Sequence, residues 1–418
     1  MRLFFVLSVL LWSCAAGFAQ TGDNAVVTLD ELIAEALKNN PEIRAFEANR
    51  SAMHARIPQM SSLDNPQFTF EIEEAPRSQP FNTSKYKYVN FELMQMFPFP
   101  GKLARSKKLA EINAEHAHHD HEEKTLEIIE KVKAAYFELY FIQRANEVNR
   151  ENTGLMQQFV NIAKIRYAVG KGMNQDVLKA NVELAKLANE QITFAQQEET
   201  AKAMLNTLLD RPPQAPLGQT VLPERKALNL NLEALQRLAL ATRPMVRHDS
   251  LGVVQSRVAN SLARRQYWPD FNVALEYVTS PLDGFRGWTT MAGISLPFAP
   301  WTVKRQRGMV EETVADISMK EALLNNTKNM ILFTVKDALV KVQTQQRLID
   351  LYRATVLPQA EQSLQATIAA YQTQQTDFLS LLDSYRMLQM FKLEYYEAEA
   401  KYEMRLAELE RAVGRKLD

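Results

Sequence analysis

The sequence has almost no cysteine, few glycines and no excess of charge of either sign. Cys14 is its only cysteine in 418 residues, which excludes a disulfide framework and any zinc site built from several cysteines. Lys plus Arg and Asp plus Glu number 49 each, which argues against a protein held on nucleic acid by bulk charge. Many short elements joined by tight turns would need more than 13 glycines. The composition therefore predicts a few long elements.

Long apolar runs and enzyme motifs are also missing. No run of 18 apolar residues follows the N-terminus, and the mean hydropathy of −0.28 is low, which excludes a helical membrane protein. The patterns G-x-S-x-G, H-E-x-x-H and the phosphate-binding P-loop do not occur. We therefore expect no enzyme activity and no cofactor.

The N-terminus has the pattern of an export signal. Residues 3–12 form an apolar stretch that is too short to span a bilayer but fits a signal peptide, predicted over residues 1–19. Small residues before Gln20 favour ordinary cleavage at that point. The alternative is that Leu11–Cys14 acts as a lipobox, which would leave a lipid on the cysteine. In both cases the chain leaves the cytoplasm.

The rest of the chain contains an internal duplication. Segments that begin near Leu29, Asn40 and Asn65 return in the same order about 203 residues later, near Leu232, Arg243 and Trp268. The sequence therefore predicts two structural repeats. Their bounds are 29–210 and 232–414, with a proline-rich, non-helical connector at 211–231.

Each repeat is predicted to contain a helix, a β-hairpin and two very long helices. Residues 103–168 have no proline and one glycine, enough for a helix of about 100 Å. Further long helices are expected near 174–209 and 376–413. Elements of this length favour an extended antiparallel coiled-coil assembly over a compact domain.

Four segments alternate apolar and polar residues, as β-strands with one apolar and one polar face do. Their length of about 9–11 residues suits an outer-membrane strand, and aromatic residues gather at their ends. Two amphipathic hairpins on a soluble core are the alternative. Four strands cannot close a barrel, so strands that cross a membrane would have to share one barrel between several chains.

The mature chain resembles the TolC family of outer-membrane efflux channels, and within it the CusC/CzcC type of the heavy-metal branch. Each motif is weak alone, but their order and duplication are specific. The motifs are Leu29–Leu32 with Asn40-Pro41, Phe97–Lys102, Ala135–Phe137, Arg166–Gly170 and Asp176–Ala180.

This resemblance implies a mainly α fold with a small β part. A homotrimer would contribute two hairpins per chain to a shared 12-stranded outer-membrane β-barrel, continued by a helical coiled-coil barrel into the periplasm. The partners would be outer-membrane lipid, a periplasmic adaptor and an inner-membrane pump of the RND type. The chain would be a passive efflux conduit, with heavy-metal cations as candidate substrates. The alternative is a periplasmic coiled-coil protein without a channel, structural or adhesive in role.

Two helix reversals are expected to form the periplasmic tips that meet the adaptor. A pair of ordinary helical turns is the alternative. The second reversal has no glycine, which leaves its geometry open. The tip residues are Val169, Gly170, Lys171 and Gly172 in the first repeat, and Thr373, Gln374, Gln375 and Thr376 in the second.

Polar residues after the tips and on the strands are candidates for the channel lining. In the family, carboxylates after the second tip form rings at the tunnel constriction, and Asp383 aligns with one such position, while Ser380 replaces a neighbouring acid. Three copies of a carboxylate around a narrow axis would favour cations; a solvated helix face is the alternative. The constriction candidates are Asp383, Asp377, Ser380 and Asp176, and the barrel-lumen candidates are Glu71, Glu92 and Glu276.

Four of the six histidines lie within six residues, at His116, His118, His119 and His121. On a helix they give two i,i+3 pairs, 116 with 119 and 118 with 121, a spacing that can share a metal ion. Because the run lies in the middle of a helix, far from the expected tip, a solvated face or a weak adventitious site is favoured. We expect no metal centre.

Overall fold

The computed structural model describes residues 26–78, 80–223 and 231–417, so the predicted signal peptide, Cys14 and part of the connector lie outside the described residues. The described chain forms two compact units, each built from several segments. Unit 1 contains residues 26–34, 135–223 and 352–400. Unit 2 contains residues 35–78, 80–134, 231–351 and 401–417. Each unit is described separately below.

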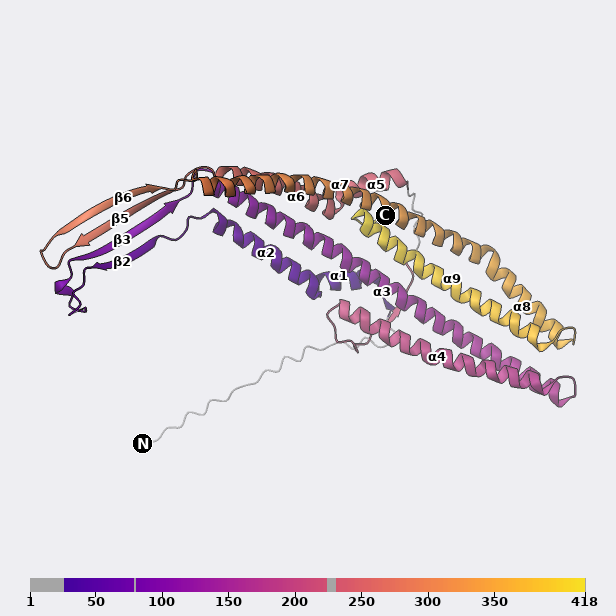
Figure 1. Ribbon diagram of the computed structural model, residues 1–418. Coiled ribbons are helices and arrows are strands. Elements are labelled where there is room, and N and C mark those ends of the chain that lie inside the picture. The colour runs from indigo at the N-terminus through magenta and orange to yellow at the C-terminus, as the bar shows by residue number, and fades with distance from the viewer. Residues whose placement is uncertain (1–25, 79, 224–230, 418) are drawn as a thin grey trace, which may run out of the picture. The chain divides into compact units, whose positions relative to one another are not determined.

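The fold is mainly helical, as predicted, and long helices dominate it (Figure 1). None of the helices in the described residues combines the length and apolar character needed to cross a bilayer. The helices are α1 (Leu29–Asn39), α2 (Pro41–Ser61), α3 (Lys102–Ala168), α4 (Asn174–Leu208), α5 (Leu232–Thr242), α6 (Pro244–Arg265), α7 (Pro300–Leu351), α8 (Leu357–Gln372) and α9 (Phe378–Val413).

Helix α3 has 67 residues and starts one residue earlier than predicted. Its counterpart in the second half of the chain is interrupted. There α7 ends at Leu351, a π-helical turn occupies Tyr352–Val356, and α8 begins at Leu357. Pro358 explains the break, because proline has no N–H to donate and its ring collides with the carbonyl four residues earlier.

Asparagine side chains cap the start of α2 and of α5. Asn40 Oδ1 accepts the backbone N–H groups of Glu42, at 2.9 Å, and Ile43, at 3.3 Å, at the start of α2. Asn231 does the same for Glu233 at the start of α5. Each cap satisfies backbone donors that have no partner within the helix.

Unit 2 contains a four-stranded antiparallel sheet, in which the two predicted hairpins are joined edge to edge by β3 and β5 (Figure 1). The strand β2 is shorter than the expected 9–11 residues, with seven. The sheet order is β2 (Gln67–Glu73), β3 (Tyr88–Phe97), β5 (Phe271–Thr279) and β6 (Arg286–Ile294).

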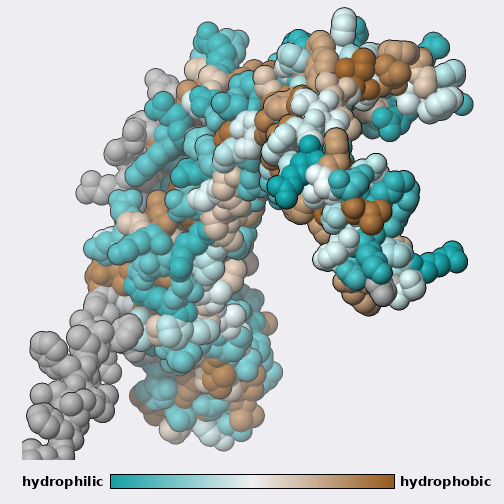
Figure 2. Space-filling view, turned by 90° about the vertical axis from the view of Figure 1, so that its left-hand side faces the viewer, coloured by the Kyte–Doolittle hydropathy of each residue, from teal (hydrophilic) through white to brown (hydrophobic). Residues whose placement is uncertain are grey.

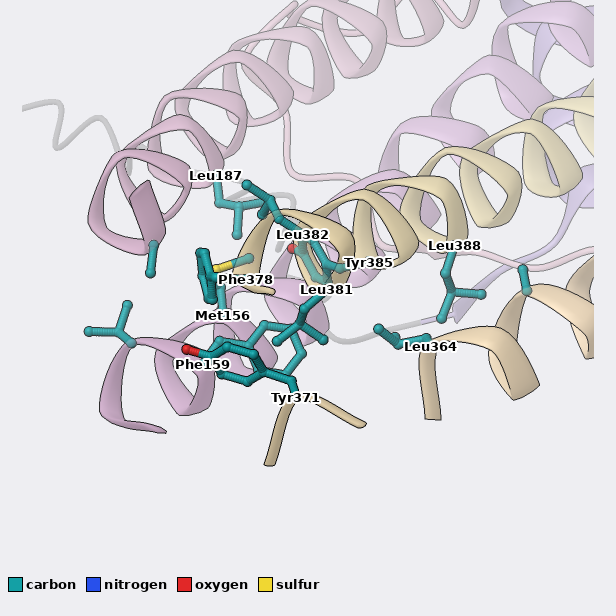
Figure 3. Close-up of a cluster of buried hydrophobic side chains, with 13 residues drawn as sticks. Met156, Phe159, Leu187, Leu364, Tyr371, Phe378, Leu381, Leu382, Tyr385 and Leu388 are labelled. Atoms are coloured by element: carbon teal, nitrogen blue, oxygen red, sulfur yellow. The ribbon is translucent and has the colours of Figure 1, made fainter. Parts of the chain in front are cut away.

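The core of unit 1 lies where α3 and α4 pack with α8 and α9 (Figure 3). Tyr385 and Phe159 are almost completely buried there, with ring centroids 5.9 Å apart in an edge-to-face arrangement. Met156, Leu187 and Leu382 fill the space around them. This core holds together the two helix pairs that carry the predicted tips.

The described part of the connector, residues 211–223, is also fixed to unit 1. The short strands β1 (Val26–Val27) and β4 (Gln219–Thr220) pair in parallel. The buried Tyr136 hydroxyl lies 2.9 Å from the carbonyl oxygen of Val27 and 3.0 Å from that of Val221, so its one proton is shared between these two acceptors. No helix occurs in residues 211–223, as the prolines predict.

Candidate channel site: the helix reversals and the strand face

The reversal between α3 and α4 is a glycine turn. Gly170 has a φ of +71°, in the left-handed region that glycine adopts without strain. Its N–H donates to the Tyr167 carbonyl at 3.0 Å, and the N–H of Lys171 donates to the Arg166 carbonyl at 2.8 Å. Two bonds of this kind satisfy carbonyls that the end of a helix leaves open.

The reversal between α8 and α9 has the same backbone bonds without glycine. Gln374 has a φ of +66°, and its N–H donates to the Tyr371 carbonyl at 3.3 Å. The N–H of Gln375 donates to the Ala370 carbonyl at 2.9 Å. The second tip therefore keeps the turn of the first, at the cost of placing a side chain in the left-handed region.

Arg166 joins the two reversals. Its guanidinium donates to the Tyr371 carbonyl and, at 3.2 Å, to the Lys171 carbonyl, and lies 4.2 Å from the centroid of the Tyr371 ring. The Gln374 side chain donates to the Lys171 carbonyl at 3.4 Å. The sequence motif Arg166–Gly170 predicted no role for Arg166 itself, although an arginine four residues before the turn glycine is well placed to meet helix-terminal carbonyls.

The predicted constriction residues lie near these reversals, and three of them, Asp377, Ser380 and Asp176, have local partners. Asp377 Oδ1 accepts the Ser380 N–H at 2.9 Å, which caps the start of α9. Hydrogen bonds from Ser380 lower the pKa of Asp377, so it stays ionised. The partner of Asp176 is the Tyr371 hydroxyl. Burial raises the pKa of this hydroxyl, and the negative charge of Asp176 raises it further. Asp383 is exposed.

One turn beyond Asp383, Arg386 forms a two-pronged ion pair with Glu183, with N···O distances of 2.9 and 2.5 Å. Glu183 is only 6% exposed, and the bond from Arg386 is the main cause of its lowered pKa. The pair joins α9 to α4. Its partners are 203 residues apart, close to the offset of the duplication, but that offset relates equivalent positions of the two repeats and does not by itself predict a contact between them.

The strand register places the lumen candidates on one face of the sheet. Glu92 lies directly opposite Glu276, and Thr69 and Thr289 complete that row across the four strands. Glu71 lies opposite Asn90, two residues from Glu92 on the same face. Side by side, Glu92 and Glu276 carry like charges, a costly arrangement that attracts cations.

The opposite face carries an aromatic row across all four strands. Phe70, Phe91, Tyr277 and Trp288 are consecutive partners, with centroid distances of 5.3, 6.5 and 5.0 Å. Trp288 is 69% exposed and Phe70 54%. Figure 2 also shows hydrophobic residues on the exterior among hydrophilic ones. An exposed apolar sheet face of this kind needs lipid or another apolar surface against it.

The exit from the sheet into α3 is fixed by the second half of the chain. Asp270 Oδ1 accepts the Phe99 N–H at 2.7 Å and the Lys102 ammonium at 2.8 Å. The rings of Phe99 and Trp268 stack with centroids 5.0 Å apart. The sequence motif Phe97–Lys102 therefore holds the two halves of unit 2 together.

The histidines of α3 make contacts beyond those that the i,i+3 spacing suggests. His116 packs on His248 of α6, with ring centroids 4.3 Å apart, and burial and this neighbour lower its pKa to about 4. His118 instead lies next to His119, with centroids 5.3 Å apart. Both of these rings approach Glu122.

Comparison with known proteins identifies the class to which this fold belongs. Residues 32–211 match the model of the family described as outer membrane efflux protein. The cobalt-zinc-cadmium resistance protein CzcC of Cupriavidus metallidurans is 22% identical over 99% of this chain and 100% of its own length. Among solved structures, CusC has a TM-score of 0.80 at 16% identity, covering 93% of this chain and 92% of its own. VceC of Vibrio cholerae has a TM-score of 0.78 at 18% identity, covering 93% of this chain and 97% of its own.

These likenesses, together with the paired helix reversals and the two-faced sheet, define an outer-membrane efflux channel that extends into the periplasm. The match to the outer membrane efflux protein family, the TolC family that the sequence resembles, covers residues 32–211, and the likeness to CzcC and CusC extends over nearly the whole chain. Members of this family are transport proteins rather than enzymes, and they act as trimers together with other parts of an efflux machinery.

Proposed function

We propose that three copies of this chain form a passive conduit through the outer membrane for substrates that an inner-membrane pump of the RND type and a periplasmic adaptor deliver. The two-faced sheet carries this proposal. Its apolar face exposes aromatic residues as a lipid-facing wall would, and its polar face carries the opposed Glu92 and Glu276. Because β2 and β6 leave open edges in the described sheet, three copies would close a barrel of 12 strands.

The parts of the chain follow from this assignment. Residues 1–19 direct export, and residues 29–210 and 232–414 are two copies of one structural unit joined by 211–231. The order helix, helix, hairpin and long helices occurs in both halves of the described chain, which supports the duplication. The two reversals are the periplasmic tips that dock the adaptor, and Asp383 of three chains narrows the tunnel near them.

Heavy-metal cations are the substrates we propose. The support is the full-length likeness to a cobalt-zinc-cadmium resistance protein and the opposed carboxylates on the sheet. A strain that lacks this gene should become sensitive to Co²⁺, Zn²⁺ or Cd²⁺, and the gene on a plasmid should restore growth. Unchanged metal sensitivity with increased sensitivity to organic compounds would overturn the metal assignment and leave the conduit in place.

Native mass spectrometry in mild detergent, combined with conductance in planar bilayers, tests the conduit itself. We expect the mass of three mature chains and discrete conductance steps. The mass of each chain also shows whether it begins at Gln20 or at a lipid-bearing Cys14. A stable monomer without conductance would favour the alternative, a periplasmic coiled-coil protein without a channel.

A further inference from the structure

We propose that His118, His119 and Glu122 on one face of α3 form a binding site for a divalent transition-metal ion of the zinc and cobalt class. One ligand atom from each of these side chains lies within 4.8 Å of the other two. His118 Nε2 is 3.4 Å from Glu122 Oε1, and His119 Nδ1 is 2.9 Å from Glu122 Oε2. This site is separate from the conduit function and does not depend on which substrate passes through the channel.

The distances suit a small tetrahedral ion. Metal–ligand bonds of 2.0–2.1 Å at tetrahedral angles put neighbouring ligand atoms about 3.3 Å apart. The two N···O distances, 3.4 and 2.9 Å to the two oxygens of Glu122, lie near that value, so small side-chain rotations would admit an ion. Two imidazoles and one carboxylate are donors that Zn²⁺ and Co²⁺ accept, and water would occupy the fourth position.

The surroundings hold one ligand in the required orientation. The other ring nitrogen of His119, Nε2, lies 3.8 Å from Glu115 Oε1. Without an ion, the 2.9 Å contact with Glu122 places the ring proton on Nδ1. An ion bound at Nδ1 requires the other tautomer, with the proton on Nε2, and the Glu115 carboxylate lies on that side of the ring. His119 is 6% exposed and therefore fixed, whereas the side chains of His118 and Glu122 are 37% and 38% exposed and leave the site open to solvent.

The histidine run provides a matched control. His121 belongs to the same run but not to the group of close ligand atoms found in the described residues. The full-length trimer, purified without a polyhistidine tag, is titrated with Co²⁺ while its visible absorption is recorded, and bound Co²⁺ is then displaced with Zn²⁺. The variants are His118→Ala, His119→Ala, Glu122→Gln and His121→Ala, each checked for trimer mass and thermal unfolding.

We expect one Co²⁺ per chain, affinity weakened at least about tenfold in His118→Ala, His119→Ala and Glu122→Gln, and affinity unchanged in His121→Ala. His118→Ala and Glu122→Gln alter partly exposed side chains, so they decide the result even if His119→Ala fails to fold. Equal losses in His118→Ala and His121→Ala would overturn the site and indicate diffuse binding by the run. Absence of Co²⁺ binding by the wild type would also overturn it, without bearing on conductance.

Discussion

Gly170 and Gln374 adopt the same left-handed backbone conformation, with φ values of +71° and +66°, at equivalent points of the two helix reversals. Each donates its N–H to the carbonyl of a tyrosine three residues earlier, Tyr167 in one case and Tyr371 in the other. Because glycine alone adopts this region without strain, the first reversal is relaxed and the second stores a small strain.

Gly170→Ala should therefore destabilise unit 1 by about 1 kcal/mol, since a Cβ is disfavoured at this φ although the space around it is open. Gly154→Ala is the matched control, because Gly154 lies inside α3 with nothing near its Cβ position. That change should stabilise the helix by up to about 1 kcal/mol. Denaturant unfolding measures both, and shifts of the same sign would contradict the assigned turn.

Loss of the Arg166 side chain should loosen the two tips from each other, because Arg166 donates to carbonyls of both reversals. In Arg166→Ala we expect larger or more frequent conductance steps in planar bilayers. Lys164→Ala, an exposed site on the same helix, should behave like the wild type. If Arg166→Ala conducts as the wild type does, the contact between the tips does not restrict the channel.

The ion pair of Glu183 with Arg386 should make stability depend on pH. The pKa of Glu183 is lowered in the folded protein, so its stabilisation is complete above the ordinary glutamate value and is lost as the pH falls through the lowered one. Thermal unfolding between neutral and acid pH should show a steeper loss for the wild type than for Glu183→Gln. Glu199→Gln, whose side chain is 77% exposed on the same helix, should keep the wild-type slope.

Asp270→Ala should weaken the junction between the sheet and α3. The change leaves the Lys102 ammonium, 8% exposed, and the Phe99 N–H without their shared acceptor. We expect a loss of about 2–4 kcal/mol and less trimer in outer-membrane fractions. Asp64→Ala, at an exposed position before β2, should leave the amount of trimer unchanged.

Glu92 and Glu276 should set the preference of the conduit for cations, because they face each other on the polar side of the sheet. Reversal potentials in a salt gradient should show a weaker cation preference for the Glu92→Gln, Glu276→Gln double variant. The charge-conserving double change to aspartate is its control. A preference that survives the glutamine changes would mean that this row does not line the lumen.

Much of the fold is encoded in local patterns. The proline-free run after Gly101 predicts α3, and strict alternation predicts β3 and β5, because side-chain direction follows from the periodicity of each element alone. The sequence did not predict the shortened β2, because alternation of residue types does not determine where strand pairing stops. It did not predict the π-helical turn before Pro358 either, because a helix can accommodate a proline through a local π-bulge.

The long helices, the two-faced strands and the glycine at the first reversal follow from the amino-acid sequence alone, because each depends on neighbours a few residues away. Contacts between distant segments are needed to place Gln374 in the conformation of Gly170 and to join the reversals through Arg166. The same holds for the pairing of Glu92 with Glu276 and for the approach of His118 and His119 to Glu122. These relationships depend on register, packing and rotamers, which are fixed only when segments distant in the chain come together.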